Sequence, residues 1–524
     1  MSRRLRRAVW RRYDNFAPME PSTLEDERTL SETPEAAPRP RKQYAIVCAA
    51  LALTAAIIAV YGETTACAFD EGFHMLAAQL VKQGRRLYVD FFFPQAPLNV
   101  WWNAAWMMVF GDTWRTSHAA AILATVATVF LAVDFVFTRF RLPNWRLVVG
   151  IAAVALVGGN WLLVEFGPIG QAYALCMLLP VIAFRLAIRA VLRPGVSLTF
   201  LCGCAVGAAA EASLLAAPVA PVVLLWILIH NRVGSRLARF GAFVAGAVTP
   251  WIPGLWMFAR APYQVRFCII DFHLLYRQVE WEGSLKHNFE IMSEWINSGH
   301  ALILALLAAA GFIWIVRSSP WARERRAEFY LCGWIAAGET AYLCWVRPTF
   351  TQYFSLLIPF LGIPAAIGFY AVATRLAGPN RRWLPFAVMM FLLCVGLGRD
   401  IYDDTSSTNW PDFEKVARKV NEVTPRNGVV LSDEFVYFIT RRPPPYGMES
   451  DDTHKLRLPA DKAALLHVVP RPELVKWVKA GRYDTVESCD DDDDQDLVDL
   501  GLPDLYAQKA EIEGCKVYWQ RKAK

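Results

Sequence analysis

The chain has 524 residues, of which 55% are hydrophobic and 13% aromatic, and its mean hydropathy is +0.27. One soluble core of this length cannot bury so much apolar surface, so the composition predicts a polytopic membrane protein. The net charge is only +6 and the basic residues fall in short clusters between apolar runs, which excludes the basic stripe of a nucleic-acid-binding protein.

Residues 1–43 are rich in Arg, Pro, Glu and Ser and have no apolar period, which predicts a disordered basic tail on the cytoplasmic side. The first apolar run lies far from the N-terminus and lacks a small-residue cleavage site. We therefore expect no cleaved signal peptide.

A transmembrane domain is predicted over residues 44–401. A spanning helix needs about 20 mainly apolar residues, and eleven runs of this kind cover 44–61, 117–137, 146–163, 170–191, 197–211, 214–230, 240–258, 299–316, 327–345, 352–373 and 384–401. If the tail is cytoplasmic and the spans alternate, every Arg cluster between spans falls on the cytoplasmic side. The odd number of spans then places the C-terminus outside.

Two parts of this count are open. The runs 197–211 and 214–230 are short, and 98–110 could be a twelfth span that reverses every later loop. Three Trp residues in 98–110 favour instead a helix at the outer interface, where Trp side chains suit the headgroup level.

The outer loop of residues 62–116 carries two adjacent acids, Asp70 and Glu71, directly after the first span. Apolar residues then recur every three or four positions from Phe73 to Val81, which predicts a helix that lies on the membrane through its apolar face. Carboxylates at such a surface suit a lipid substrate with a polar head.

The residues of this loop resemble those of a known family. The order Asp-Glu-Gly-Phe from Asp70, then GRRLYVDFFFPQAPL from Gly84 and VFGDTWRTSH from Val109, is similar to the first outer loop of the GT-C glycosyltransferases. The most similar members are bacterial relatives of protein O-mannosyltransferases and the lipid A aminoarabinose transferases. RPTFTQYFSLLIPF at 347–360 resembles more weakly the family's entry into a late span.

The resemblance implies an inverting enzyme of the inner (cytoplasmic) membrane. It would move a sugar from a polyprenyl-phosphate donor to a lipid, glycan or protein acceptor on the outer face, with Asp70 as general base. Glu71 would support Asp70 or contact the acceptor. The chemistry needs the same groups, because a base must take the acceptor's proton and cations must stabilise the negative charge that builds on the leaving phosphate. The predicted substrate contacts are Asp90, Glu165, His273, Arg277, Arg347 and Tyr353.

The chain also departs from the family. Gly72, Phe73 and His74 stand where aminoarabinose-type members carry an Arg, and Gln171 replaces an acidic residue for which Glu165 could substitute. No metal ligand is therefore assigned, and a divalent cation is left open as a cofactor. Eleven Cys without CxxC or Cys/His spacing predict neither a disulfide framework nor a zinc site.

Each acidic candidate has a structural alternative. Asp70 can cap the following helix, and Asp90 can bond to local backbone. Glu211 and Glu339 lie in or near apolar runs, where ionisable groups are commonly functional, although Glu211 can also lie at a wetted turn. The aspartates 490–494 suggest a cation site, but like charges repel each other and a solvated loop is favoured.

Residues 402–524 are more charged and have no long apolar run, which predicts a small extracytoplasmic α/β domain. Helical periodicity covers 410–423 and 471–481, and strand-like runs cover 427–433, 482–489 and 514–522.

The competing interpretation of the whole chain is a transporter or flippase of a lipid-linked substrate. Internal repeats and paired broken spans are missing from the sequence, and the acids lie at the membrane surface instead of its midplane, which favours the transferase.

Overall fold

The structure is a computed structural model that describes residues 40–68, 70–142, 144–275, 284–317, 319, 321, 323–346, 348–450, 453–454, 456–489 and 501–522. Three predictions lie outside these residues: the tail before residue 40, the substrate contacts Arg277 and Arg347, and the loop of aspartates 490–494.

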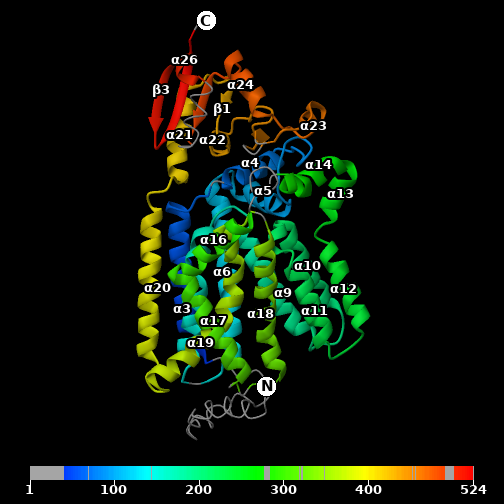
Figure 1. The fold of residues 1–524 in the computed structure, drawn as a ribbon, viewed down its shortest axis with the longest axis vertical. Coiled ribbons are helices and arrows are strands. Elements are labelled where there is room, and N and C mark those ends of the chain that lie inside the picture. The colour runs from blue at the N-terminus through cyan, green and yellow to red at the C-terminus, as the bar shows by residue number, and fades with distance from the viewer. Residues whose placement is uncertain are drawn as a thin grey trace, which may run out of the picture.

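Long apolar helices form one bundle (Figure 1). Six segments of the described chain are long and apolar enough to cross a membrane: α3 (Arg41–Thr64), α6 (Trp114–Arg139), α9 (Tyr173–Ala190), α17 (Gly299–Arg317), η3 (Thr351–Leu357) continued by α19 (Ile358–Ala377), and α20 (Trp383–Asp404). A seventh is the pair α12 (Arg236–Val248) and α13 (Ile252–Arg260), which is bent by 59°. The chain is therefore a multi-pass membrane protein.

Further helices complete the bundle, and all of them except α18 are shorter. They are α7 (Arg146–Gly158), α8 (Trp161–Phe166), α10 (Ser197–Ala212), η1 (Leu214–Ala216), α11 (Val219–His230), α14 (Pro262–Arg266), η2 (Phe267–Asp271), α16 (Ser284–Asn297) and α18 (Arg323–Trp345). Every apolar run of the sequence coincides with one of these helices or with one of the longer ones. α18 is long but begins with the charged sequence RERRAE, which lowers its hydropathy.

Two glycines allow α17 and α19 to pack closely. A Cβ atom at Gly311 would collide with the carbonyl oxygen of Pro364, and one at Gly368 would collide with that of Leu307. Small residues at such crossings let backbones approach, which is how helices commonly pack in lipid.

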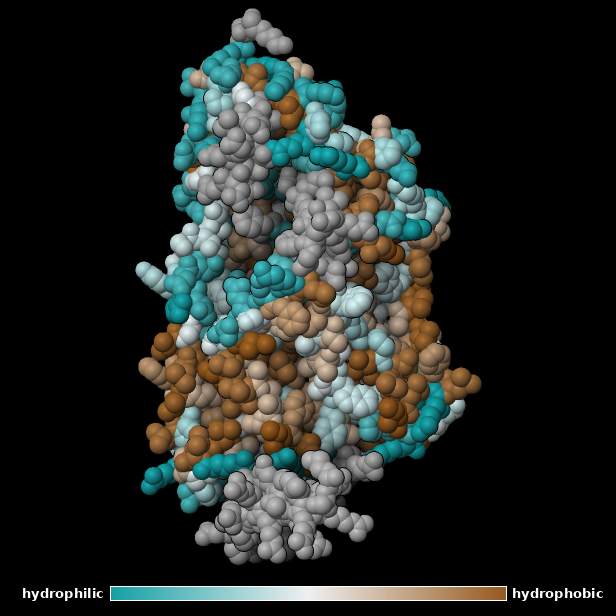
Figure 2. Space-filling model, in the orientation of Figure 1, coloured by the Kyte–Doolittle hydropathy of each residue, from teal (hydrophilic) through white to brown (hydrophobic). Residues whose placement is uncertain are grey.

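The outer surface of the bundle is apolar. Leu53, Leu123, Leu306 and Phe391 expose between 58% and 67% of their surface, and Figure 2 shows a hydrophobic band bounded by hydrophilic rows above and below. Such a band has the character of a lipid-facing surface.

Two helices lie across the upper end of the bundle, where the C-terminal segment is also found (Figure 1). They are α4 (Glu71–Lys82) and α5 (Leu98–Phe110). Because α5 lies across the bundle and not along it, a twelfth span at this place finds no support.

The prediction that α4 lies on the membrane is wrong. Phe73, Leu76 and Leu80 are buried in the protein, and the Nε2 atom of Gln79 donates a hydrogen bond to the carbonyl oxygen of Phe438 at 3.2 Å. An apolar helix face binds protein as readily as lipid, and here α22 of the C-terminal segment packs on α4.

We expect Leu76→Asp to abolish the folded protein, because an unpaired carboxylate in this fully buried position costs several kcal/mol. The matched control is Val109→Asp on α5, whose side chain is 72% exposed. Size-exclusion chromatography after detergent extraction should recover only the control. A well-folded Leu76→Asp protein would contradict the packing of α4.

The C-terminal segment holds a four-stranded sheet of order β1-β2-β4-β3. Its strands are β1 (Val430–Leu431), β2 (Thr485–Ser488), β3 (Tyr506–Ile512) and β4 (Cys515–Arg521), and its helices are α21 (Trp410–Val423), α22 (Glu434–Thr440), α23 (Ala460–Leu465), α24 (Arg471–Ala480) and α26 (Leu502–Leu505). β1 runs parallel to β2, and the other two pairs are antiparallel.

Most elements of this segment fall where the sequence places them, including α21 and α24. β3 was not predicted, because this edge strand is largely exposed and lacks an apolar pattern. A disulfide between Cys489 and Cys515, also not predicted, joins the end of β2 to the start of β4.

Candidate active site

A cavity of about 640 Å³ lies at the upper end of the bundle. It brings together four of the predicted site residues, which come from distant parts of the chain: Asp70, Glu165, His273 and Tyr353. The remaining wall is mixed, with apolar residues such as Leu214, Ile269 and Phe350 and polar residues such as Gln171, Tyr173 and Gln352. Such a wall can hold both an apolar chain and a polar head group.

Asp70 is exposed at the wall of this cavity. It precedes α4 with helical backbone angles (φ −67°, ψ −9°), and its side chain makes no capping hydrogen bond to the helix. The structure therefore does not show the hydrogen bond that a helix-capping role of Asp70 would need. The carboxylate lies where it could meet a substrate.

Glu71 is placed differently from its neighbour. Its side chain is fully buried and does not line the cavity. Oε1 accepts hydrogen bonds from the backbone N–H of Gly170 at 2.6 Å and lies 2.7 Å from Nε2 of His118, and Oε2 accepts from the indole N–H of Trp410 at 2.9 Å. The carboxylate thus joins α4 to α6, to the turn before α9 and to α21.

His118 extends this arrangement. Its Nδ1 lies 2.6 Å from the carbonyl oxygen of Gly62, which can only accept, so Nδ1 carries a proton. Nε2 of His118 and Oε1 of Glu71 lie 2.7 Å apart. This contact is a hydrogen bond when either Nε2 or Oε1 carries a proton.

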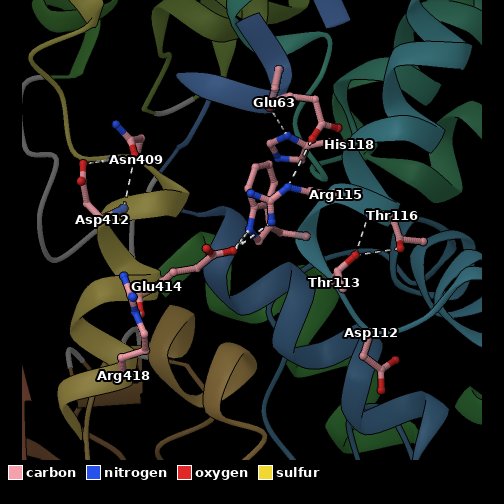
Figure 3. A network of polar contacts seen from close by, with 12 residues as sticks. Glu63, Asp112, Thr113, Arg115, Thr116, His118, Asn409, Asp412, Glu414 and Arg418 are labelled. Atoms are coloured by element: carbon pink, nitrogen blue, oxygen red, sulfur yellow. Dashed lines mark hydrogen bonds and ion pairs between the residues drawn. The ribbon is translucent and has the colours of Figure 1, made fainter. Parts of the chain in front are cut away.

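A network of polar contacts lies beside His118 (Figure 3). Glu414 of α21 accepts from the indole N–H of Trp114 at 2.8 Å and from Arg115 at 3.0 Å. Arg115 also lies 3.5 Å from Glu63 at the end of α3. The C-terminal segment is thus bonded to α6, and Arg115 of α6 is in turn paired with the end of α3.

Glu165 of α8 also lines the cavity. Burial raises the pKa of this carboxyl to about 8, and the nearby Asp404 and Asp400 of α20 contribute to the rise. Asp404 itself accepts a hydrogen bond from the hydroxyl of Tyr61 at 2.5 Å.

Asp90 is not brought to the cavity. It forms an ion pair with Arg86 at 2.6 Å, and this hydrogen-bonded partner holds the pKa of Asp90 below its usual value. The contact favours the local structural role.

The described wall of the cavity includes no Lys or Arg that could contact a leaving phosphate. Lys82 pairs with Asp112, Arg85 with Glu449 and Arg266 with Asp271, all away from it.

Within the described ranges, a single group of three side chains has the spacing of metal ligands, namely Glu487, Cys489 and Cys515. It lies in the C-terminal sheet, and its two sulfur atoms are joined in the disulfide. The described carboxylates of the cavity do not form such a group.

Several residues at or behind the cavity were not predicted, notably His118, Trp410 and His74. His74 lines the wall from α4, and burial lowers its pKa to about 3, so it is neutral. The His of the loop motif VFGDTWRTSH was the one available signal. Its partner Glu71 is 47 positions away, and Trp410 is 339 positions from Glu71.

The bundle, the two helices across its upper end and the cavity beneath them define a membrane protein with the fold of the GT-C glycosyltransferases, as the loop motifs predicted. Neither a family model nor a curated protein matches the sequence.

The particular relatives are solved structures. ArnT from Cupriavidus metallidurans aligns in its apo state with a TM-score of 0.63 and 13% identity over 91% of this chain and 98% of ArnT. The structure of ArnT bound to undecaprenyl phosphate aligns with a TM-score of 0.62 and 15% identity, over 91% of this chain and 97% of ArnT. The archaeal oligosaccharyltransferase AglB from Archaeoglobus fulgidus is less similar, with a TM-score of 0.44 and 11% identity over 84% of this chain and 69% of AglB.

Proposed function

We propose that this chain is an inverting glycosyltransferase of the inner membrane that moves a sugar from a polyprenyl-phosphate donor to a lipid, glycan or protein acceptor on the outer face. The observation that carries the proposal is an exposed carboxylate, Asp70, in a cavity with an apolar and a polar wall. ArnT, which has the same fold, has been solved with undecaprenyl phosphate.

In this reaction the acceptor hydroxyl attacks the anomeric carbon, and the bond from that carbon to the phosphate oxygen breaks. Asp70 takes the hydroxyl proton, and the carrier leaves as polyprenyl phosphate. Leu214, Ile269 and Phe350 would contact the first units of the carrier, while His273 and Tyr353 would contact its head group. Arg277 and Arg347 remain proposals for the leaving phosphate.

For the membrane topology we propose eleven spans. Seven are the single helices α3, α6, α9, α10, α17, α18 and α20, and four are pairs of consecutive elements, namely α7 with α8, η1 with α11, α12 with α13, and η3 with α19. The N-terminus is then cytoplasmic, and residues 402–524 form an α/β domain outside. The disulfide between Cys489 and Cys515 supports this placement, because such bonds persist in oxidising compartments.

We expect a reporter fused after residue 410 to be active outside the cytoplasm and one fused within 318–325 to be active inside, because the Arg clusters then all face the cytoplasm. Paired alkaline phosphatase and green fluorescent protein fusions measure this. A cytoplasmic reporter after residue 410 would overturn the external domain and the count of spans.

The function itself is tested with the purified full-length chain in detergent. A panel of polyprenyl-phosphate sugars labelled in the sugar is supplied with membrane-lipid and peptide acceptors, and release of polyprenyl phosphate is measured together with labelled product. A flippase gives neither signal in detergent, since no compartments exist there. Mass spectrometry of surface glycans in a deletion strain then identifies the acceptor.

A further inference from the structure

The cavity holds two carboxylates in opposite settings. Asp70 is exposed, whereas Glu165 is half-buried and lies close to the end of α20. The charged groups that act on Glu165 are Asp404 and Asp400, both acidic.

The surroundings of Glu165 offer little compensation for a negative charge. From α3, the hydroxyl of Tyr61 donates a hydrogen bond to Asp404. From α17, His300 lies 3.4 Å from Asp400 and is directed to that acid. From η3, Tyr353 shares the cavity wall, as do Asp70 and His273. An ionised Glu165 would add a third negative charge to Asp400 and Asp404 in a partly dry site.

The proposed donor is itself an anion, since the carrier bears a phosphate. An ionised carboxylate in the wall would repel that phosphate, while a neutral carboxyl would give it a hydrogen bond. Hydrogen bonds from a neutral donor to an ionised oxygen are about twice as strong as neutral ones. The described part of the wall contains no Lys or Arg. A neutral carboxyl would therefore add a hydrogen-bond donor to Arg277 and Arg347, the cations proposed for this phosphate.

We infer that Glu165 works as a neutral carboxylic acid that donates a hydrogen bond to a phosphate oxygen of the polyprenyl carrier, and that its half-buried position, together with the neighbouring Asp404, keeps it protonated. The inference rests on the proposed function and assigns the second carboxylate of the cavity a role opposite to that of Asp70. Glu165 stays protonated throughout, so no proton is transferred.

Ionisation of Glu165 should weaken binding of the polyprenyl carrier as the pH rises. With a pKa of about 8, Glu165 is protonated at neutral pH and ionised at alkaline pH. Binding of the carrier should therefore weaken about tenfold from pH 7 to pH 9, as the protonated fraction falls. The carrier phosphate ionises near pH 6, below this range and equally for every variant.

The experiment measures the affinity of the full-length protein for polyprenyl phosphate at several pH values, together with transfer by the same samples. Glu165→Gln keeps an N–H donor at every pH, so its affinity should match that of the wild type at pH 7 within a few-fold and lose the alkaline decline. Glu165→Ala should bind weakly at all pH values.

A second pair of variants tests the role of the neighbour. Asp404→Asn removes a negative charge next to Glu165 and should move the alkaline decline to lower pH. The matched control is Asp403→Asn at the same helix end, where Asp403 is exposed and pairs with Arg399 at 3.3 Å. It should leave the decline unchanged.

Each remaining outcome has a meaning. An alkaline decline that persists in Glu165→Gln, or that does not move in Asp404→Asn, overturns the inference and leaves the transferase intact. Binding that strengthens with pH and is lost with a chelator would instead make Glu165 a metal ligand, which also overturns it. Failure to bind polyprenyl phosphate at any pH would overturn the proposed function.

Discussion

Asp70→Asn should give a stable protein whose turnover is lower by roughly 10²–10⁴-fold, the usual worth of a positioned general base. Asn has nearly the same shape as Asp but cannot take a proton from the acceptor hydroxyl. Because Asp70 is exposed at the cavity wall, little packing changes. Sugar transfer and the thermal unfolding midpoint of the purified variant are the two measurements.

The matched control for this experiment is Asp90→Asn. Asp90 belongs to the same outer loop but pairs with Arg86 away from the cavity, so its loss should leave turnover within a few-fold of the wild type. An active Asp70→Asn protein would remove Asp70 from the mechanism and restore the capping role, since Asn caps helices as well as Asp.

Asp70 and Glu71 show what the sequence can and cannot predict about this site. Their motif identifies the loop, and Asp70 lies exposed at the cavity wall, where its role as general base stays a prediction. The surroundings of Glu71 could not be predicted, because its partners His118, Gly170 and Trp410 come from three other segments.

The sequence predicted where the helices lie in the chain better than it predicted which elements pack against them. Each apolar run forms a helix, because a stretch of about 20 apolar residues has few other stable conformations in lipid. The position of α4 was wrong for a physical reason: helical periodicity states that one face is apolar but not whether lipid or protein covers it. In this chain α5 and α22 pack on α4, and α22 does so from more than 350 positions away.

The second large effect is expected for Glu71→Gln, which should destabilise the fold. The carboxylate has donors on both oxygens, and an amide offers only one oxygen, so its NH₂ group must face either Trp410 or the pair His118 and Gly170. Breaking a buried charged contact of this kind costs about 3–5 kcal/mol. A lower unfolding midpoint in detergent should accompany the loss of transfer.

Trp410→Phe separates this effect from catalysis. It removes the indole N–H while keeping an aromatic ring against Trp114, and should cost about 1–3 kcal/mol because one acceptor is left without its donor. Trp114→Phe is the control, since its bond goes to the half-exposed Glu414 and its loss should matter less.

The double variant Glu71→Gln with Trp410→Phe decides between the two roles of Glu71. If Glu71 positions the loop, the amide can turn its NH₂ toward the space left by the indole N–H, and the double variant should lose less stability than the two single variants added together. If Glu71 instead takes part in the reaction, as the resemblance implied, Glu71→Gln would be folded and inactive, and Trp410→Phe would not restore it. A stable, inactive Glu71→Gln protein would therefore return Glu71 to the reaction and make its buried contacts a means of holding a catalytic group.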